Sequence, residues 1–285
     1  MNRFENITKP LIWSTTLLLA AIVAGCGGGD GIPSTIPPGA GPTGGVCTGG
    51  SCVNLKTAGN YVILAEAGIS YTPTATVTST PKIIGNIGVS PAAASTITGF
   101  ALNLPAGGAY STSTLVTGAI YAPGYAPPTP TLLTTAVTDK LDAYNAAAGM
   151  ATAGGGLAGG SPGTACPGTG NLGGVTLTPG VYTCTVGILI PTATAVTLDG
   201  AGVYVIKTTQ TLTQSANTQV ILINGALPQN VFWQVAGTVS IEAGAHMEGV
   251  VMSASNIALL TGATVTGRLL SKTQITMISN TVTQP

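Results

Sequence analysis

The chain has 285 residues, zero formal net charge and only 6% charged residues, against about 25% in a typical soluble protein. With so few lysines and arginines it offers no basic surface to neutralise a phosphate backbone, so we expect no nucleic-acid partner. Abundant glycine and threonine with only 5% aromatic residues disfavour a conventional globular core and favour thin, repetitive β layers.

The N-terminus has the pattern of a bacterial lipoprotein signal. Arg3 and Lys9 precede a short apolar segment at 11–24, and the run VAGC at 23–26 resembles a lipobox, which is cleaved before its cysteine. We expect 1–25 to be the signal peptide, and 26–52 to be a lipidated Cys26 with a Gly/Pro-rich tether. An ordinary signal peptide with an incidental cysteine is the alternative. The lipobox predicts export and a membrane anchor, at the outer membrane or cell surface, with release from the cell as a further outcome.

Four further cysteines, an even number in an exported chain, predict two disulfides. Three pairings are possible, and we favour Cys47–Cys52 with Cys166–Cys184 because each closes a short, Gly-rich loop. A metal site is the weaker alternative because His246 is the only histidine. We therefore expect no metal and no other cofactor.

In the first half of the domain, the sequence pattern predicts short strands at 61–65, 83–89, 97–104 and 115–121, followed by one helix. The helix is expected at about 130–149, with Thr129 as N-cap, Pro130 in the first turn and Gly149 as the stop. Its buried stripe is predicted to contain Leu133, Val137, Leu141, Tyr144 and Ala148. A Gly-rich loop at about 150–174 follows.

The last third repeats with a period of about 18 residues, at 230–249, 250–267 and 268–285. Each repeat contains three short strands, and glycine or asparagine stands at most corners, where the backbone must turn. This period predicts a β-solenoid with triangular coils, within a single domain at 53–285.

The middle strand of each coil alternates between apolar and small polar residues, so its two sets of side chains point in opposite directions. The inward set contains Leu212, Val239, Ile241, Ile257, Leu259, Ile275 and Met277. The outward set contains Thr211, Thr213, Thr238, Ser240, Asn256, Ala258, Gln274 and Thr276.

Several runs together resemble the microbial ice-binding (antifreeze) proteins. They are LKTAGNYVIL at 55–64, GNIGVSP at 85–91, LTPGVY at 177–182, NVFWQVAG at 230–237, EG at 248–249 and GRLL at 267–270. The resemblance implies a discontinuous right-handed β-solenoid with one flanking helix, whose N-terminal strands are threaded among the C-terminal coils. It also implies that the Gly-rich loop with Cys166 and Cys184 is a capping region.

The resemblance further implies that the protein binds the surface of an ice crystal, as a monomer, through the outward face of the middle strands. It adds Ser70 and Thr72 to the outward residues named above. Threonine is stiff at χ1 and offers both a methyl and a hydroxyl, whereas charged groups would disturb a flat face. Exposed threonines also simply suit β-strands. Leu260, Ile278 and Glu242 share the outward parity and interrupt the pattern.

The acidic residues do not form a recognisable catalytic set. Asp139 and Asp142 are interpreted as solvated helix charges, Asp199 as a turn residue, and His246 beside Glu248 as a weak candidate pair. We therefore expect that the protein is not an enzyme. The remaining alternative is a cell-surface adhesin or glycan-binding solenoid without ice activity, which would need exposed aromatic side chains, whereas Trp233 is expected to be packed.

Overall fold

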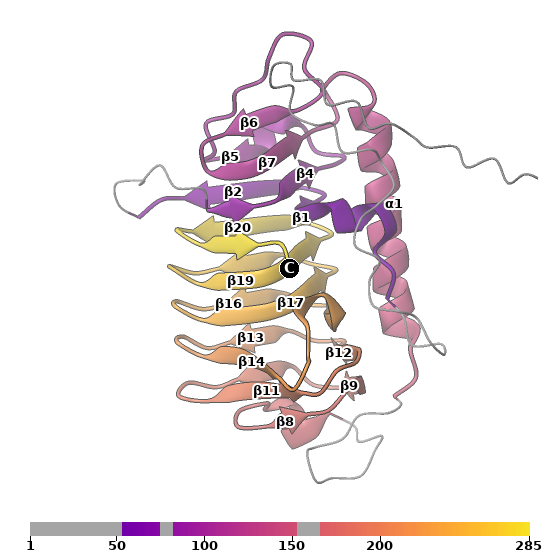
Figure 1. Ribbon diagram of the computed structural model, residues 1–285, viewed down its shortest axis with the longest axis vertical. Coiled ribbons are helices and arrows are strands. Elements are labelled where there is room, and N and C mark those ends of the chain that lie inside the picture. The colour runs from indigo at the N-terminus through magenta and orange to yellow at the C-terminus, as the bar shows by residue number, and fades with distance from the viewer. Residues whose placement is uncertain (1–52, 75–81, 153–165) are drawn as a thin grey trace, which may run out of the picture. The chain divides into compact units, whose positions relative to one another are not determined.

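The structure is a computed structural model that describes residues 53–74, 82–152 and 166–285. Within these ranges the chain is mainly parallel β-structure with one long α-helix, α1 (Thr129–Gly149) (Figure 1). Four short 3-10 helices accompany it: η1 (Lys56–Asn60), η2 (Ala94–Thr96), η3 (Pro167–Gly170) and η4 (Pro228–Asn230). No helix among the described residues is long and apolar enough to cross a membrane.

One sheet has seven parallel strands, and we call it the seven-stranded sheet. Its spatial order is β10 (Ile188–Ile190), β13 (Leu212–Gln214), β16 (Val239–Ile241), β18 (Ile257–Leu259), β20 (Gln274–Ile278), β2 (Gly68–Thr72) and β5 (Ile97–Thr98).

The other sheet has fourteen strands and contains two ladders, since β17 (His246–Ser253) and β19 (Thr264–Ser271) each pass from one ladder into the other. The helix-side ladder contains β9 (Gly180–Cys184), β12 (Tyr204–Thr208), β15 (Val231–Val235), the C-terminal halves of β17 and β19, β1 (Tyr61–Ala65) and β4 (Asn86–Val89). The His246 ladder contains β8 (Thr176–Leu177), β11 (Ala195–Asp199), β14 (Gln219–Ile223), the N-terminal halves of β17 and β19, β21 (Thr281–Thr283) and β3 (Ile83–Ile84). At the N-terminal end of the stack, β7 (Val116–Tyr121) pairs with β3 and β4, and β6 (Ser111–Ser113) pairs with β7 in the antiparallel sense.

Glycine permits the bend between these two ladders. Gly249 has φ +107°, and a Cβ on Gly267 would lie 1.8 Å from the carbonyl oxygen of Gly249. Neither position has room for a side chain, so β17 and β19 cross the corner with their backbones in close approach.

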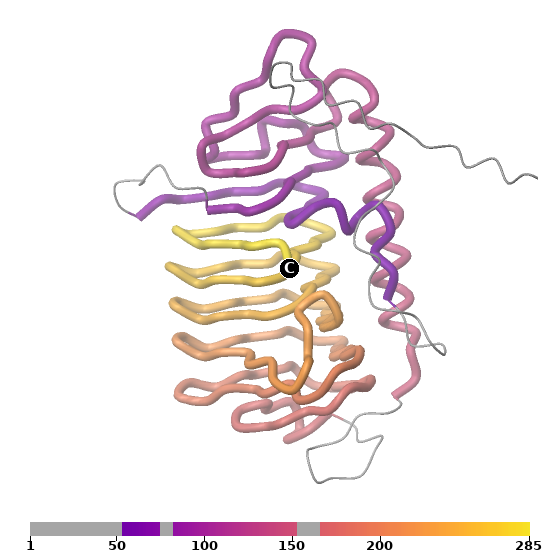
Figure 2. Tube along the Cα trace, in the orientation of Figure 1, coloured from indigo at the N-terminus to yellow at the C-terminus, as the bar shows by residue number. Residues whose placement is uncertain are grey.

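The order of stacking differs from the order of the chain. β1 pairs with β19, β2 with β20, and β3 with β21. The N-terminal strands therefore continue the stack beyond the last C-terminal coil, as the adjacent indigo and yellow tubes in Figure 2 show. This arrangement explains why the first half of the sequence shows no coil repeat.

The apolar core has two parts. The larger part lies inside the stacked coils and contains Trp233, Tyr182 and Tyr204, all fully buried. The smaller part lies outside the helix-side ladder and joins Phe232, Val250 and Leu270 to the buried face of α1. The helix therefore packs lengthwise on the helix-side ladder, away from the seven-stranded sheet.

The helix agrees with the prediction in its extent but not in its details. Thr129 does not cap it; its hydroxyl donates to the carbonyl of Ala109. The predicted stripe was partly wrong, because Leu141 and Ala148 are exposed. The buried face contains Leu133, Ala136, Asp139, Lys140, Ala143 and Ala147. This face is rotated about the helix axis relative to the predicted stripe, because the charged side chains of Asp139 and Lys140 have their partners on that side.

Asp139 is one of those charged residues, and its interpretation as a solvated charge was wrong. Its carboxylate accepts hydrogen bonds from the backbone N–H (3.1 Å) and hydroxyl (2.5 Å) of Thr57 in η1. Burial raises its pKa, but these bonds and the Lys56 ammonium outweigh burial and hold the pKa below its usual range. Asp142 is exposed, and its carboxylate lies 3.0 Å from the Lys56 ammonium.

The predicted strands at 61–65 and 115–121 are present with small changes at their ends, 83–89 is divided at Gly85 into β3 and β4, and 97–104 forms a strand only at Ile97–Thr98. The Cys166–Cys184 disulfide is confirmed. Cys26, Cys47, Cys52 and most of the Gly-rich loop, at 153–165, lie outside the described residues.

Candidate functional site

The outer face of the seven-stranded sheet presents a column of small side chains in direct register. Thr213 pairs with Ser240, Ser240 with Ala258, Ala258 with Thr276, and Thr276 with Ser70. We call these five residues the central column. Leu189 and Thr98 extend it at its two ends. Neighbouring strands of a sheet lie about 4.8 Å apart, so the column is a regular array along the stack.

The core side of the same strands fixes this orientation. The residues on either side of each column member are fully or almost fully buried, such as Val239 with Ile241 and Ile257 with Leu259. A slip of one residue would move these side chains into solvent, so the register is strongly specified. The predicted inward and outward sets of the C-terminal coils are therefore confirmed as buried and solvent-facing.

Two further columns flank the central one. The first column, two residues before each central residue, contains Thr211, Thr238, Asn256 and Gln274, with Gly68 on β2. The third column, two residues after, contains Ser215, Glu242, Leu260, Ile278 and Thr72. Thr72 thus lies beside Ile278 at the rim, whereas Ser70 lies in the middle of the face.

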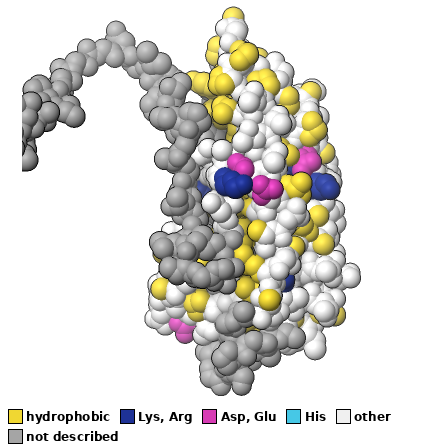
Figure 3. Space-filling view, turned by 90° about the vertical axis from the view of Figure 1, so that its right-hand side faces the viewer, with side chains coloured by type: hydrophobic (Ala, Val, Ile, Leu, Met, Phe, Trp, Pro, Cys, Tyr) yellow, Lys and Arg dark blue, Asp and Glu magenta, His cyan; other side chains and the backbone are white. Residues whose placement is uncertain are grey.

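The three columns contain one ionisable residue, Glu242, and it lies in the third column. Figure 3 shows a cluster of charged side chains on the helix-bearing side, and Asp199 and Glu248 lie on the His246 ladder. The ion pairs on the helix-bearing side join Lys56 to Asp139 and Asp142, and Lys140 to Glu66. The outer face of the seven-stranded sheet is therefore almost free of charge.

Sequence reasoning missed the two ends of the central column. Thr98 follows the inward Ile97, so strand alternation predicts that its side chain points outward. Its pairing with Ser70 depends on a contact between segments that are distant in the chain. Leu189 stands between two isoleucines, and an apolar run gives no sign of which residue faces outward.

The candidate acid–base pair lies on the His246 ladder. His246 Nε2 is 2.8 Å from Glu248 Oε1, and its Nδ1 is 2.8 Å from the Thr264 hydroxyl. His246 and Glu248 lie on β17, and Thr264 lies on the neighbouring strand β19. Among the described residues, no group of three or more His, Cys, Asp or Glu side chains could hold a metal ion.

A small pocket lies between α1 and the C-terminal ends of β17 and β19, lined in part by Glu66, Lys140, Tyr144 and Lys272. Its volume is about 130 Å³. Ligand pockets usually enclose roughly 300–1,000 Å³, so this one is small for a bound metabolite. Burial lowers the pKa of Lys140, while its hydrogen bond to Glu66 opposes that effect.

The chain matches the family model for ice-binding-like proteins over residues 63–283, which includes every strand of the seven-stranded sheet. The chain belongs to this family. It is 36% identical over 240 residues to an ice-binding protein of Flammulina populicola, an alignment covering 84% of this chain and 91% of that protein. It is 38% identical over 248 residues to one of Colwellia sp., covering 84% and 87%.

Solved structures of family members share the fold. The crystal structure of an ice-binding protein with antifreeze activity from an Arctic yeast matches with a TM-score of 0.72 and 38% identity, covering 82% of this chain and 94% of that one. A domain of a Shewanella frigidimarina ice-binding protein matches with a TM-score of 0.66 and 29% identity, covering 81% and 96%. The mainly β architecture with a single long helix is thus that of the family.

Proposed function

We propose that this protein binds ice through the outer face of the seven-stranded sheet and thereby inhibits ice growth or recrystallisation. The contact residues are the central and first columns with Thr72: Thr211, Thr213, Thr238, Ser240, Asn256, Ala258, Gln274, Thr276, Ser70 and Thr72. The observation that carries the proposal is the in-register central column of small, uncharged side chains.

Such a face suits ice because ice offers a flat lattice without charge or pockets. Many weak contacts bind such a lattice only if the groups making them are already fixed in position. The strands fix the spacing, and β-branched threonine is stiff at χ1, so little entropy remains to be lost on binding. A charged side chain would retain its own hydration shell and stand above the plane.

The fold that we infer is a right-handed β-solenoid with triangular coils and discontinuous threading, capped by the Gly-rich loop at about 150–174. Three ladders per stack and the pairing of β21 with β3 support it. The Cys166–Cys184 disulfide supports the cap, because it ties the end of this loop to β9.

We also propose that the chain is exported, cleaved before Cys26 and lipid-anchored there, and that it acts as a monomer without enzymatic activity or cofactor. The lipobox run and the disulfide support the export and the anchor. A glycan-binding role has less support, because Trp233 is fully buried and its indole N–H donates to the Glu248 carbonyl. It offers no ring for a sugar to stack on.

The test of this function is the growth of a single ice crystal in a solution of the purified mature protein. We expect faceted crystals and a measurable thermal hysteresis, which is the gap between melting and growth temperatures. Round crystals that grow as soon as they are cooled below the melting point would contradict the proposal.

A further inference from the structure

A row of buried hydroxyls lies at the corner where the chain leaves the helix-side ladder and turns into the seven-stranded sheet. Thr208, Ser253 and Ser271 are the last residues of β12, β17 and β19, and each is at most 3% exposed. Strand register places them in one row with Val235, since Thr208 pairs with Val235, Val235 with Ser253, and Ser253 with Ser271.

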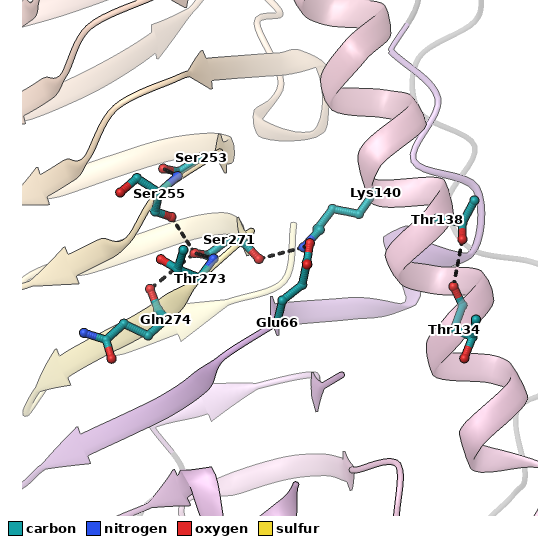
Figure 4. Close-up of polar contacts among 9 residues, drawn as sticks. All are labelled: Glu66, Thr134, Thr138, Lys140, Ser253, Ser255, Ser271, Thr273 and Gln274. Atoms are coloured by element: carbon teal, nitrogen blue, oxygen red, sulfur yellow. Dashed lines mark hydrogen bonds and ion pairs between the residues drawn. The ribbon is translucent and has the colours of Figure 1, made fainter. Parts of the chain in front are cut away.

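Each hydroxyl makes the same two hydrogen bonds, and the Ser271 hydroxyl also lies 3.3 Å from the Gln274 carbonyl. Each accepts from the backbone N–H two residues further on, and each donates to a corner carbonyl of the preceding coil. Thr208 accepts from the Gln210 N–H (3.0 Å) and donates to the Val186 carbonyl (2.7 Å). Ser253 accepts from the Ser255 N–H (3.0 Å) and donates to the Gly237 carbonyl (2.8 Å). Ser271 accepts from the Thr273 N–H (3.0 Å) and donates to the Ser255 carbonyl (2.7 Å). Figure 4 shows the last of these corners.

Corners without a hydroxyl make the coil-to-coil bond directly. Where Val235 occupies the row, the Gly237 N–H donates to the Gln210 carbonyl at 2.8 Å. Where Ala65 occupies it, the Ala67 N–H donates to the Thr273 carbonyl at 2.8 Å. The hydroxyl is thus inserted between an N–H and a carbonyl that in the other corners bond to each other directly.

The residue that follows each bridged N–H belongs to the first column. Gln210, Ser255 and Thr273 are followed by Thr211, Asn256 and Gln274. The Thr211 carbonyl accepts from the Ile188 N–H, and the Asn256 carbonyl accepts from the Val239 N–H. The hydroxyl bridge therefore lies one residue before the start of the proposed ice-contacting face, in three coils.

The helix holds the same corner from outside. Lys140 of α1 donates to the Ser271 carbonyl at 2.6 Å and to Glu66, in the next corner of the stack, at 2.9 Å. Figure 4 shows Lys140 reaching across from the helix to both partners. The corner at Ser271 is thus fixed by its own hydroxyl and by a buried ammonium.

We propose that Thr208, Ser253 and Ser271 are positioning residues for ice binding, whose hydroxyls set the height of the first column against the coil beneath it. The inference rests on the proposed function. Removal of a hydroxyl leaves the bridged N–H and carbonyl without their partner, and pairing them directly, as at Gly237 and Ala67, shifts the corner. That shift moves Thr211, Asn256 or Gln274 out of the plane, and a rigid lattice cannot follow it.

The test compares two double variants of the full-length protein. Thr208→Val with Ser253→Ala removes both hydroxyls while nearly preserving volume. Thr208→Ser with Ser253→Thr exchanges the two residue types and keeps both hydroxyls. Ser111→Ala is the control for loss of a buried hydroxyl elsewhere, since Ser111 is fully buried and lies 2.9 Å from the Tyr125 hydroxyl, far along the chain from this corner.

We expect the hydroxyl-free variant to lose most of its thermal hysteresis at temperatures where circular dichroism shows it folded. The exchanged variant and Ser111→Ala should retain most of theirs. If the double variant does not fold, the single Ser253→Ala, with Ser253→Thr as its control, is expected to show the same contrast in smaller degree. Wild-type thermal hysteresis in a folded hydroxyl-free variant would overturn the proposal.

Ala258→Tyr, measured alongside, separates this inference from the function on which it rests. If Ala258→Tyr abolishes thermal hysteresis and the hydroxyl-free variant does not, the ice-contacting face stands and the positioning role is wrong. If Ala258→Tyr leaves it unchanged, the choice of face is wrong, and the positioning role falls with it.

Discussion

Two outer faces of this protein carry threonines on short parallel strands, and they differ in what interrupts those threonines. The central column of the seven-stranded sheet contains only threonine, serine and alanine from Thr213 to Ser70. On the His246 ladder, a comparable column contains Thr197, Ile221, Glu248, Thr266 and Thr283. Threonine suits any exposed strand, so its presence alone does not mark a functional face. We propose that the unbroken run of small, uncharged side chains marks it.

Placing charge on each face should give the largest contrast. Ala258→Lys with Thr276→Lys puts two ammonium groups side by side in the central column, and we expect thermal hysteresis to be nearly abolished. Thr266→Lys with Thr283→Lys makes the same adjacent pair on the His246 ladder and should leave it near wild type. Both pairs repel, at a cost of up to about 1 kcal/mol, so melting curves should move similarly. Equal losses of activity would mean that the faces are not functionally distinct.

Removing the acid from the proposed ice-contacting face should give a smaller effect of opposite sign, and removing the acid from the His246 ladder should not. Glu242 stands in the third column, and Glu242→Thr should raise thermal hysteresis modestly by extending the uncharged area. Glu248→Thr should give no gain, and it should cost about 1 kcal/mol of unfolding free energy because His246 loses its 2.8 Å partner. A gain from Glu248→Thr would show that the His246 ladder also contacts ice.

The smallest effect is expected at His246 itself. His246→Ala removes the contacts to Glu248 and Thr264 and should lower the unfolding free energy by about 1 kcal/mol. Thermal hysteresis should stay at the wild-type value, since the residue lies on the other face. The measurement is ice-crystal growth at matched concentrations, together with thermal melting, and a strong loss of hysteresis without unfolding would place His246 in the ice contact.

The sequence predicted most where local alternation and the coil repeat agree. Ser240 and Ala258 could be assigned to the outer face because each lies between two apolar residues whose burial fixes its direction. The row of Ser253 and Ser271 was also visible as an 18-residue spacing, but its role depends on hydrogen bonds to the coil beneath, which no single strand reveals.

The prediction failed where partners are distant in the chain. The buried face of α1 is rotated because Lys140 pairs with Glu66, 74 residues away, and Asp139 with Thr57, 82 residues away. Helical periodicity counts apolar residues only, so it cannot anticipate that charged side chains will be buried. Ser70 entered the site through the family resemblance, since its position depends on β2 pairing with β20, a strand about 200 residues further along the chain.

One pair of variants tests the central claim most directly. Ala258→Tyr places a ring in the middle of the central column, where it would lift the ice lattice off its neighbours, while Thr266→Tyr places the same ring on the His246 ladder. Thr266 is a better control than Thr264, whose hydroxyl contacts His246. With both variants folded, the account predicts that Ala258→Tyr loses most of its thermal hysteresis and that Thr266→Tyr keeps it. Loss in Thr266→Tyr with activity retained in Ala258→Tyr would contradict the account and place the ice-contacting face on the His246 ladder.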